Sequence, residues 1–131
     1  MANNFEEKSD KTFESAELLV LNQHKNSSIH CYYYSCLQLM QHFLNNHYGY
    51  SESDIKNIGN SKESHNDLLA VVKKKFSDEG IVEITLFSEF ILIKKQRVKA
   101  DYGMNYVIDT EFTKKKTVYF REKFKSLIYD I

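Results

Sequence analysis

The sequence predicts an all-α fold, an antiparallel up-and-down bundle of four to five helices within a single domain of 131 residues. Two observations lead to this prediction. The chain contains no proline and only four glycines, each at a break between periodic segments, so long helices can run without interruption. Within the segments, apolar residues recur at alternating steps of three and four, which is the spacing of one helix face. Short connections between such segments favour an up-and-down bundle.

The periodicity divides the chain into five helical segments, about 9–25, 28–48, 61–78, 83–102 and 109–129, so that the domain core spans about 9–129. The apolar faces of the first three consist of Phe13, Ala16, Leu19 and Val20, then Ile29, Tyr33, Cys36, Met40 and Phe43, then Leu68, Leu69, Val72 and Phe76. A short polar residue can cap each first turn, because its oxygen accepts a free backbone N–H. The candidate caps are Ser9 or Asp10, Ser27 or Ser28, and Ser61 or Ser64.

The fourth segment is ambiguous at its start, because Ile81-Val82-Glu83-Ile84-Thr85 is β-branched and suits a strand. An apolar seam favours a helix instead. This seam consists of Val82, Leu86, Phe90 and Ile93, and it is continued by Arg97 and Ala100. The fifth segment places Phe120, Phe124, Leu127 and Ile131 on one face, with Asp109 as its cap.

The composition is that of a soluble globular protein, with 42% apolar and 27% charged residues. Acidic and basic residues balance at 18 each, which argues against a dedicated nucleic-acid coat. The sequence has no apolar run of membrane-spanning length and no secretory signal at its start, so we expect a cytoplasmic protein without a membrane partner. Cys31 and Cys36 are five residues apart in a helical pattern and face different ways, which predicts two reduced thiols.

No metal, cofactor or catalytic motif is recognisable. None of the five histidines follows a glutamate by three residues, and neither His-Glu-x-x-His nor Cys-x-x-Cys occurs. A nucleophile elbow and a glycine-rich phosphate loop are also absent. We therefore predict no metal site, no cofactor and no catalytic residue. Whether the chain is an enzyme stays open, although the missing motifs argue against it.

One charged residue interrupts the fourth apolar seam. The guanidinium of Arg97 cannot lose its proton, so on an apolar face it needs a carboxylate, a phosphate or water. Asp101, one helical turn later, is the nearest partner in the sequence. The segment 97–103 therefore predicts one wall of a polar cleft, with Tyr102 as a hydrogen-bond donor or stacking ring at its rim.

Two further features have alternative interpretations. The lysine runs 73–75, 94–95 and 114–116 are typical of solvated helix faces, although together they could line a groove for RNA phosphates. In the triplet Tyr32, Tyr33 and Tyr34, the middle ring belongs to the core stripe and the outer two flank it by about 100°. Aromatic residues at such positions favour core or dimer packing, and base stacking is the alternative.

Three stretches follow one another in the chain: the tyrosine-rich 30–36, then Ser64-His65-Asn66-Asp67-Leu68, then Arg97-x-x-Ala100-Asp101-Tyr102-Gly103. In this order they resemble the HEPN (higher eukaryotes and prokaryotes nucleotide-binding) family, over about residues 13–129. The resemblance implies a bundle of four or five helices that usually homodimerises. Many bacterial members are partners of a small nucleotidyltransferase in toxin–antitoxin-like pairs, and others are metal-independent ribonucleases.

Ribonucleases of this family use an arginine followed four to six residues later by a histidine. In this chain the residues at that distance from Arg97 are Asp101, Tyr102 and Gly103, and no histidine follows. An arginine can stabilise phosphate charge, but RNA cleavage also needs groups that exchange protons. The resemblance therefore implies binding rather than cleavage, with His65 as the residue that could reach the cleft from the third helix.

We therefore expect a homodimeric HEPN-type binding subunit, the partner of a small nucleotidyltransferase, with a cleft for a nucleotide or RNA. The expected ligand-binding residues are Arg97, Lys99, Asp101, Tyr102 and His65, and the expected cleft or dimer aromatics are Tyr32, Tyr33 and Tyr34. The alternatives are an unconventional metal-independent ribonuclease and a plain helical interaction protein. In the last case the Arg97–Asp101 pair would only end a helix.

Overall fold

The computed structural model describes residues 4–58, 64–102 and 109–131, except for the side chains of residues 64, 65, 84 and 102. This part of the chain is all-helical and contains no strand, which confirms the predicted all-α class. The six helices are α1 (Phe5–Leu21), α2 (Lys25–Tyr48), α3 (Glu52–Ile58), α4 (Ser64–Asp78), α5 (Ile84–Tyr102) and α6 (Thr110–Tyr129). No helix in these ranges is long and apolar enough to cross a membrane.

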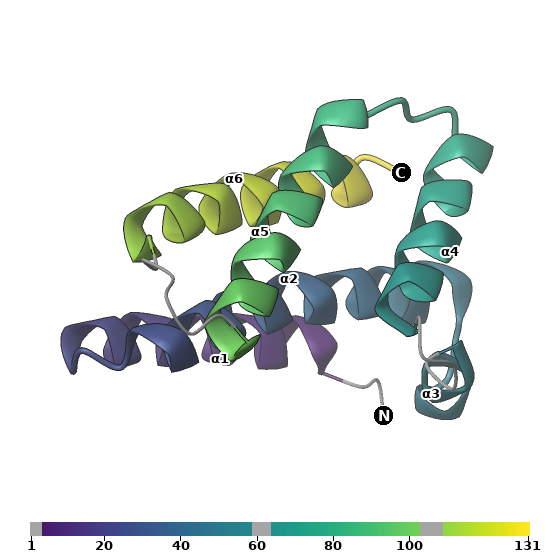
Figure 1. Cartoon of the computed structure of the whole chain (residues 1–131). Coiled ribbons are helices and arrows are strands. Elements are labelled where there is room, and N and C mark those ends of the chain that lie inside the picture. Colours follow the sequence, from purple (N-terminus) through teal and green to yellow (C-terminus); the bar gives the residue numbers. More distant parts are fainter. Residues whose placement is uncertain (1–3, 59–63, 103–108) are drawn as a thin grey trace.

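Helix α2 is the centre of the fold. It forms an antiparallel hairpin with α1 and also packs against α5, α6, α4 and α3 (Figure 1). In this view α6 runs in the same direction as α2, whereas α4 and α5 run across them. A simple up-and-down bundle is therefore not confirmed, and the crossing of α5 over α2 is what creates the site described below.

Several predicted boundaries differ from the structure. Helix α1 spans Phe5–Leu21 rather than about 9–25, and α2 starts at Lys25 rather than at 28. The sequence reasoning missed the short helix α3 altogether. Its seven residues bury only Ile55, so they produce no apolar stripe that periodicity could detect.

One of the predicted helix caps was confirmed. Asp109 accepts a hydrogen bond from the Phe112 N–H at 2.9 Å and caps α6. The proposed caps of α1 and α2 were wrong, because all of these residues lie inside the helices. Ser28 donates back to the Lys25 carbonyl oxygen at 2.6 Å, and Ser9 donates to the Ser35 carbonyl oxygen at 2.5 Å, so both hydroxyls have other partners.

The core lies between α2, α4, α5 and α6 and is rich in aromatic rings. Phe43 of α2, Phe76 of α4 and Phe124 of α6 contact one another with ring centroids 5.2–5.8 Å apart. Phe120 links this group to Phe90 of α5. Each of these side chains is almost fully buried, and burying one such ring stabilises the fold by roughly 1.5–3 kcal/mol.

The predicted seam on α5 is largely correct, since Leu86, Phe90, Ile93 and Ala100 are all buried. Val82 was wrongly assigned to it: the helix starts two residues later, and Val82 is 81% exposed. On α6 the predicted Ile131 is likewise exposed and lies beyond the helix, and Ile128 is buried instead. The seam therefore fixes which face of α5 turns toward α2, and Arg97 lies at its C-terminal end.

Candidate functional site

Arg97 lies where α5 crosses the first half of α2. Its side chain is 19% exposed, and its guanidinium carbon lies 5.4 Å from the ring centroid of Tyr33 and 5.9 Å from that of Tyr34. Both distances are typical of cation–π contacts. Arg97 therefore lies on the side of α5 that faces α2, mostly shielded from solvent and beside two tyrosines of that helix.

Asp101 is the carboxylate partner of Arg97, as its position one turn later predicted. The Nε atom of Arg97 lies 3.0 Å from Oδ2 of Asp101. The N–H does not point at that oxygen, so the buried Nε makes no hydrogen bond within the described part of the chain. We regard the contact as an ion pair without hydrogen-bond alignment. Such a pair restrains Arg97 less than a bidentate one does.

The structure adds His30, which the sequence reasoning did not select. Nδ1 of His30 lies 3.8 Å from Oδ1 of Asp101, and its ring lies 4.6 Å from that of Tyr34. The Asp101 carboxylate therefore lies between a guanidinium from its own helix and an imidazole from α2. His30 stands one turn before Tyr34 in the sequence, but only the structure shows that this side of α2 faces α5.

A hydrogen bond fixes the crossing point. The side-chain amide of Asn26 donates to the Ala100 carbonyl oxygen at 2.9 Å, which ties the first turn of α2 to the last turn of α5. A pocket of about 280 Å³ opens here, and its lining residues are Asn26, Ser27, His30, Cys31 and Asp101. Arg97 lies behind Asp101, one contact from the pocket.

The charges around this pocket act in both directions, because the Asp101 carboxylate that lines it repels an anion. Its floor includes residues of the first turn of α2, where backbone N–H groups lack helical partners and carry partial positive charge. The end of α5 contributes partial negative charge, which Arg97 offsets. Burial raises the pKa of Tyr33, although the Arg97 guanidinium acts in the opposite direction, so this phenol stays protonated at neutral pH.

Two predicted residues lie elsewhere. Tyr32 is fully buried against α1, where its ring packs 5.7 Å from that of Phe13 and its hydroxyl donates to Glu17 at 3.3 Å. It belongs to the α1–α2 interface because it lies about 100° around the helix from Tyr33. Lys99 is exposed and lines a different hollow, between α4 and α5. The side chains of Tyr102 and His65 lie outside the described residues.

The three lysine runs do not all line one groove. On α6, Lys114 pairs with Glu17 of α1 at 3.0 Å, whereas Lys116 pairs with Glu89 of α5 at 2.8 Å, so the two point to different sides. On α4, the ammonium of Lys75 lies over the Tyr48 ring at 4.6 Å. The RNA groove considered from the sequence is therefore not formed by these three runs together.

The other arginine, Arg121 of α6, is only 8% exposed and lies against α1. It donates to the hydroxyl of Ser9 and to Asp10 Oδ1, the latter at 2.5 Å, and it packs over the Phe13 ring. Lys125 reaches the same Asp10 oxygen at 3.1 Å. This polar cluster joins α6 to α1.

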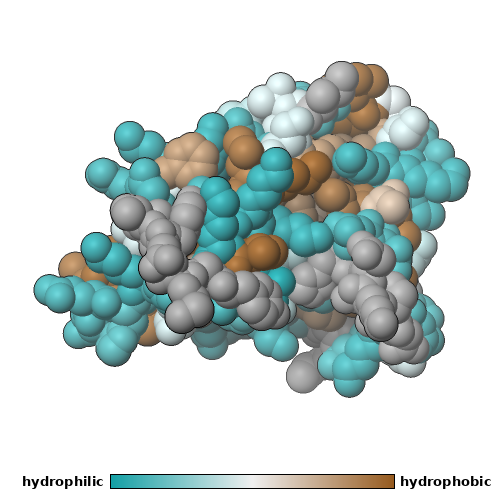
Figure 2. Space-filling view, viewed as in Figure 1, coloured by the Kyte–Doolittle hydropathy of each residue, from teal (hydrophilic) through white to brown (hydrophobic). Residues whose placement is uncertain are grey.

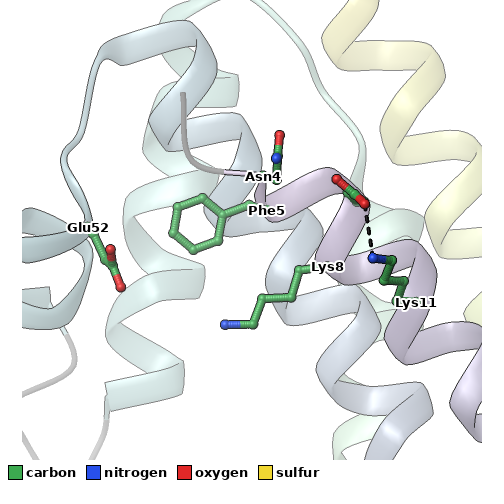
Figure 3. Close-up of a pocket in the computed structure, with 6 residues that line it drawn as sticks. Asn4, Phe5, Lys8, Lys11 and Glu52 are labelled. Atoms are coloured by element: carbon green, nitrogen blue, oxygen red, sulfur yellow. Dashed lines mark ion pairs between the residues drawn. The ribbon is translucent and has the colours of Figure 1, made fainter. Parts of the chain in front are cut away.

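A second pocket, of about 390 Å³, lies between the start of α1 and the start of α3 (Figure 3). Lys8 and Glu52 point into it from the two helices, while Glu7 and Lys11 form an ion pair of 3.0 Å at its edge. No predicted site residue lines it. Across the described ranges, no group of three His, Cys, Asp or Glu side chains could hold a metal ion.

Comparisons with known proteins add no relative. No family model matches the chain, and neither a curated protein nor a solved structure matches it.

Proposed function

We propose that this chain is a HEPN-type binding subunit that holds a phosphate-bearing ligand, a nucleotide or RNA, at the Arg97 site. The observation that supports this most is the state of Arg97 itself. It is a permanent cation, mostly buried, beside a pocket, and it is held by one carboxylate without hydrogen-bond alignment. A phosphate oxygen could provide the aligned hydrogen bonds that Asp101 does not, because a guanidinium matches phosphate geometry with two parallel N–H groups.

In this proposal each residue of the site has a distinct role. Arg97 binds the phosphate. Asp101 limits how far the Arg97 side chain moves when the ligand binds. His30 and the first turn of α2 line the pocket in which the rest of the ligand lies. The rings of Tyr33 and Tyr34 lie within cation–π distance of the guanidinium and help to keep it in place.

The binding experiment is calorimetric titration with ATP and with a short single-stranded RNA. Arg97→Gln is expected to weaken binding at least tenfold, which is about 1.4 kcal/mol. Arg97→Lys keeps the charge but loses the two-pronged geometry, so it should also bind more weakly than the wild type. Lys115→Gln removes an equal charge from an exposed position on α6 and is the matched control. Equal affinities for Arg97→Gln and Lys115→Gln would contradict the proposal.

The protein partner in this proposal is a small nucleotidyltransferase, in a toxin–antitoxin-like pair, and the chain itself forms a homodimer. Both parts rest on the resemblance of segments 30–36, 64–68 and 97–103 to the family. Co-expression with a nucleotidyltransferase encoded in the neighbouring gene tests the first, with co-purification as the expected result. Sedimentation of the purified chain tests the second, and a monomer at all concentrations would contradict it.

One observation favours a second candidate, a metal-independent ribonuclease. His30 brings an imidazole to Asp101 and Arg97 from another helix, so a proton-exchanging group does lie at the site although no histidine follows Arg97 in the chain. In this reaction His30 would take or give the proton and Arg97 would stabilise the phosphate charge. Purified protein should then degrade RNA in the presence of a chelator, and His30→Asn should abolish the activity while RNA still binds.

A further inference from the structure

A second surface, separate from the Arg97 site, lies between α4 and α5. Helix α4 packs mainly on α2 and α3, whereas α5 packs on α2 and α6, so the two ribbons are set apart, and side chains such as Phe76 and Phe87, with ring centroids 5.3 Å apart, fill part of the space between them. Figure 1 shows this separation, and Figure 2 shows hydrophobic residues gathered between the two helices with hydrophilic residues around them. Two adjoining hollows of about 420 and 300 Å³ share Ile91. We call them together the α4–α5 groove.

The floor of the groove is apolar and mainly aliphatic. Leu69 of α4 is buried at its base, while Ile91 and Val98 of α5 remain 38% and 41% exposed. Ile91 and Val98 are seven residues apart, so they form one stripe along α5. Val82, before the helix, extends the apolar surface at the other end and is 81% exposed. Exposed apolar residues that line a hollow with a charged rim mark an interaction site more often than scattered single residues do.

The rim of the groove is basic. The lysines that line it are Lys73, Lys94, Lys95 and Lys99. Two of them reach across the gap: Lys94 donates to Asn66 of α4, and the ammonium of Lys73 lies 5.8 Å from the Phe87 ring centroid. Glu83, the acidic residue among those that line the two hollows, is 3.6 Å from the ammonium of Lys123. An occupant therefore meets positive charge along both edges.

We propose that the α4–α5 groove binds an acidic amphipathic helix of a partner protein. From Phe87 to Val98 the axis of α5 rises about 16 Å, which is three turns of an occupying helix. Leucine-type side chains at i, i+3, i+4 and i+7 would pack on Ile91, Val98 and Leu69, as in other helix-in-groove complexes. Glutamates on both flanks of that helix would pair with the lysines of the rim.

The aliphatic floor distinguishes this occupant from RNA. Phosphates could pair with the same lysines, but bases bind non-specifically by stacking on exposed aromatic faces. Two rings line the hollows: Phe76 is 1% exposed, and Phe87 is 6% exposed with Lys73 near its face. Leu69, Ile91 and Val98 offer methyl groups, which suit branched aliphatic side chains rather than planar bases.

The test uses a fluorescein-labelled acidic peptide of about 14 residues, four helical turns, with leucines at the spacing above and glutamates on both flanks. Its anisotropy is measured with the full chain. Saturable binding is expected, and Ile91→Glu should raise the Kd at least tenfold. Val98→Ser and Lys95→Glu should each raise it severalfold. Leu18→Glu, at an exposed position on α1, is the matched control and should leave the Kd unchanged. Melting curves of all variants verify that they fold.

Several results would overturn this inference. One is a scrambled peptide that binds as tightly as the designed one, and another is equal Kd values for Ile91→Glu and Leu18→Glu. The other contradicting results are displacement of the peptide by short RNA and a binding curve that does not saturate up to about 0.5 mM peptide. Dissociation of a wild-type homodimer by Ile91→Glu would show that a second copy occupies the groove instead. The inference is independent of the proposed function: Arg97→Gln should leave peptide binding intact, and Ile91→Glu should leave nucleotide binding intact.

Discussion

The two arginines of this chain lie at different helix contacts, Arg97 against α2 and Arg121 against α1, and they differ in how many hydrogen-bond partners they have. Arg121 donates to Ser9 and Asp10, packs on the Phe13 ring and is 8% exposed. Arg97 has Asp101 and two tyrosine rings, is 19% exposed in its side chain, and keeps a buried Nε without a hydrogen bond among the described residues. Both cations are mostly shielded from solvent, but among the described residues hydrogen-bond partners from a distant segment are found for Arg121 and not for Arg97.

This difference indicates which arginine stabilises the fold and which one binds a ligand. A buried charge that is paired and hydrogen-bonded across two helices fixes how those helices pack, and breaking it leaves the partner uncompensated. A buried charge with one local partner contributes little to packing and keeps its capacity to bind another anion. We therefore assign Arg121 to the fold and Arg97 to the ligand, and the predictions below test this assignment.

The largest expected effect is on stability. Arg121→Met removes the hydrogen bonds to Asp10 and to the Ser9 hydroxyl and leaves Asp10 with Lys125 alone, so it should lower the free energy of unfolding by about 1.5–3 kcal/mol. Arg97→Met should lower it by about 1 kcal/mol or less, since its ion pair lies within one helix. Urea denaturation of the two variants measures both values. Similar losses for both would contradict the assignment.

A pH-dependent effect should follow from His42, which belongs to the Arg121 side. Its Nε2 lies 3.2 Å from Oε2 of Glu6, and Tyr129 donates to the same carboxylate oxygen. Burial lowers the pKa of His42 below its ordinary 6.5, although Glu6 acts to raise it. Because the unfolded chain then binds the proton more readily, stability is present above pH 6.5 and is lost as the pH falls below that value.

The measurement is the urea midpoint of wild type and His42→Gln between pH 8 and pH 5, a range of about one and a half units on each side of the free imidazole pKa. The wild type should lose stability toward pH 5, and the variant should lose less. Asp10 adds a second loss at lower pH. Its burial raises the pKa, but hydrogen bonds from Lys125 and Arg121 outweigh this and lower it. Parallel curves for the two proteins above pH 5 would exclude His42 as the cause.

A smaller effect is expected at the crossing of α2 and α5. Asn26→Ala removes the hydrogen bond to the Ala100 carbonyl and should cost about 1 kcal/mol of stability. It should also weaken ligand binding, because the pocket depends on how these two helix ends meet. Asn22→Ala is the matched control, since the Asn22 amide donates only within the α1 end, to Leu18 at 2.9 Å. If Asn26→Ala binds the ligand as tightly as the wild type does, the crossing of α2 and α5 does not shape the ligand site.

The sequence predicted well what is local in the chain. The all-α class, the buried seam of α5 from Leu86 to Ala100 and the pairing of Arg97 with Asp101 all follow from spacings of three and four residues. The Asp109 cap follows from chemistry within one turn. Each of these depends on neighbours that the helix itself brings together.

What the sequence missed depends on how helices cross. His30 reaches Asp101 only because α5 runs over the start of α2. Ser9 and Asp10 looked like helix caps, but they are partners of Arg121, which is 111 residues away from Asp10. Tyr32 was grouped with its neighbours Tyr33 and Tyr34, although one step along a helix turns a side chain by about 100° and so toward α1. No single-sequence pattern reports these crossings.

The most direct test of the account measures stability and ligand binding on the same variant, Arg97→Gln. We predict that the unfolding free energy stays within about 1 kcal/mol of the wild type, while the affinity for ATP or short RNA falls at least tenfold. An unfolding loss as large as that of Arg121→Met, or nucleotide affinity equal to that of Lys115→Gln, would show that Arg97 is a second structural arginine and not a binding residue.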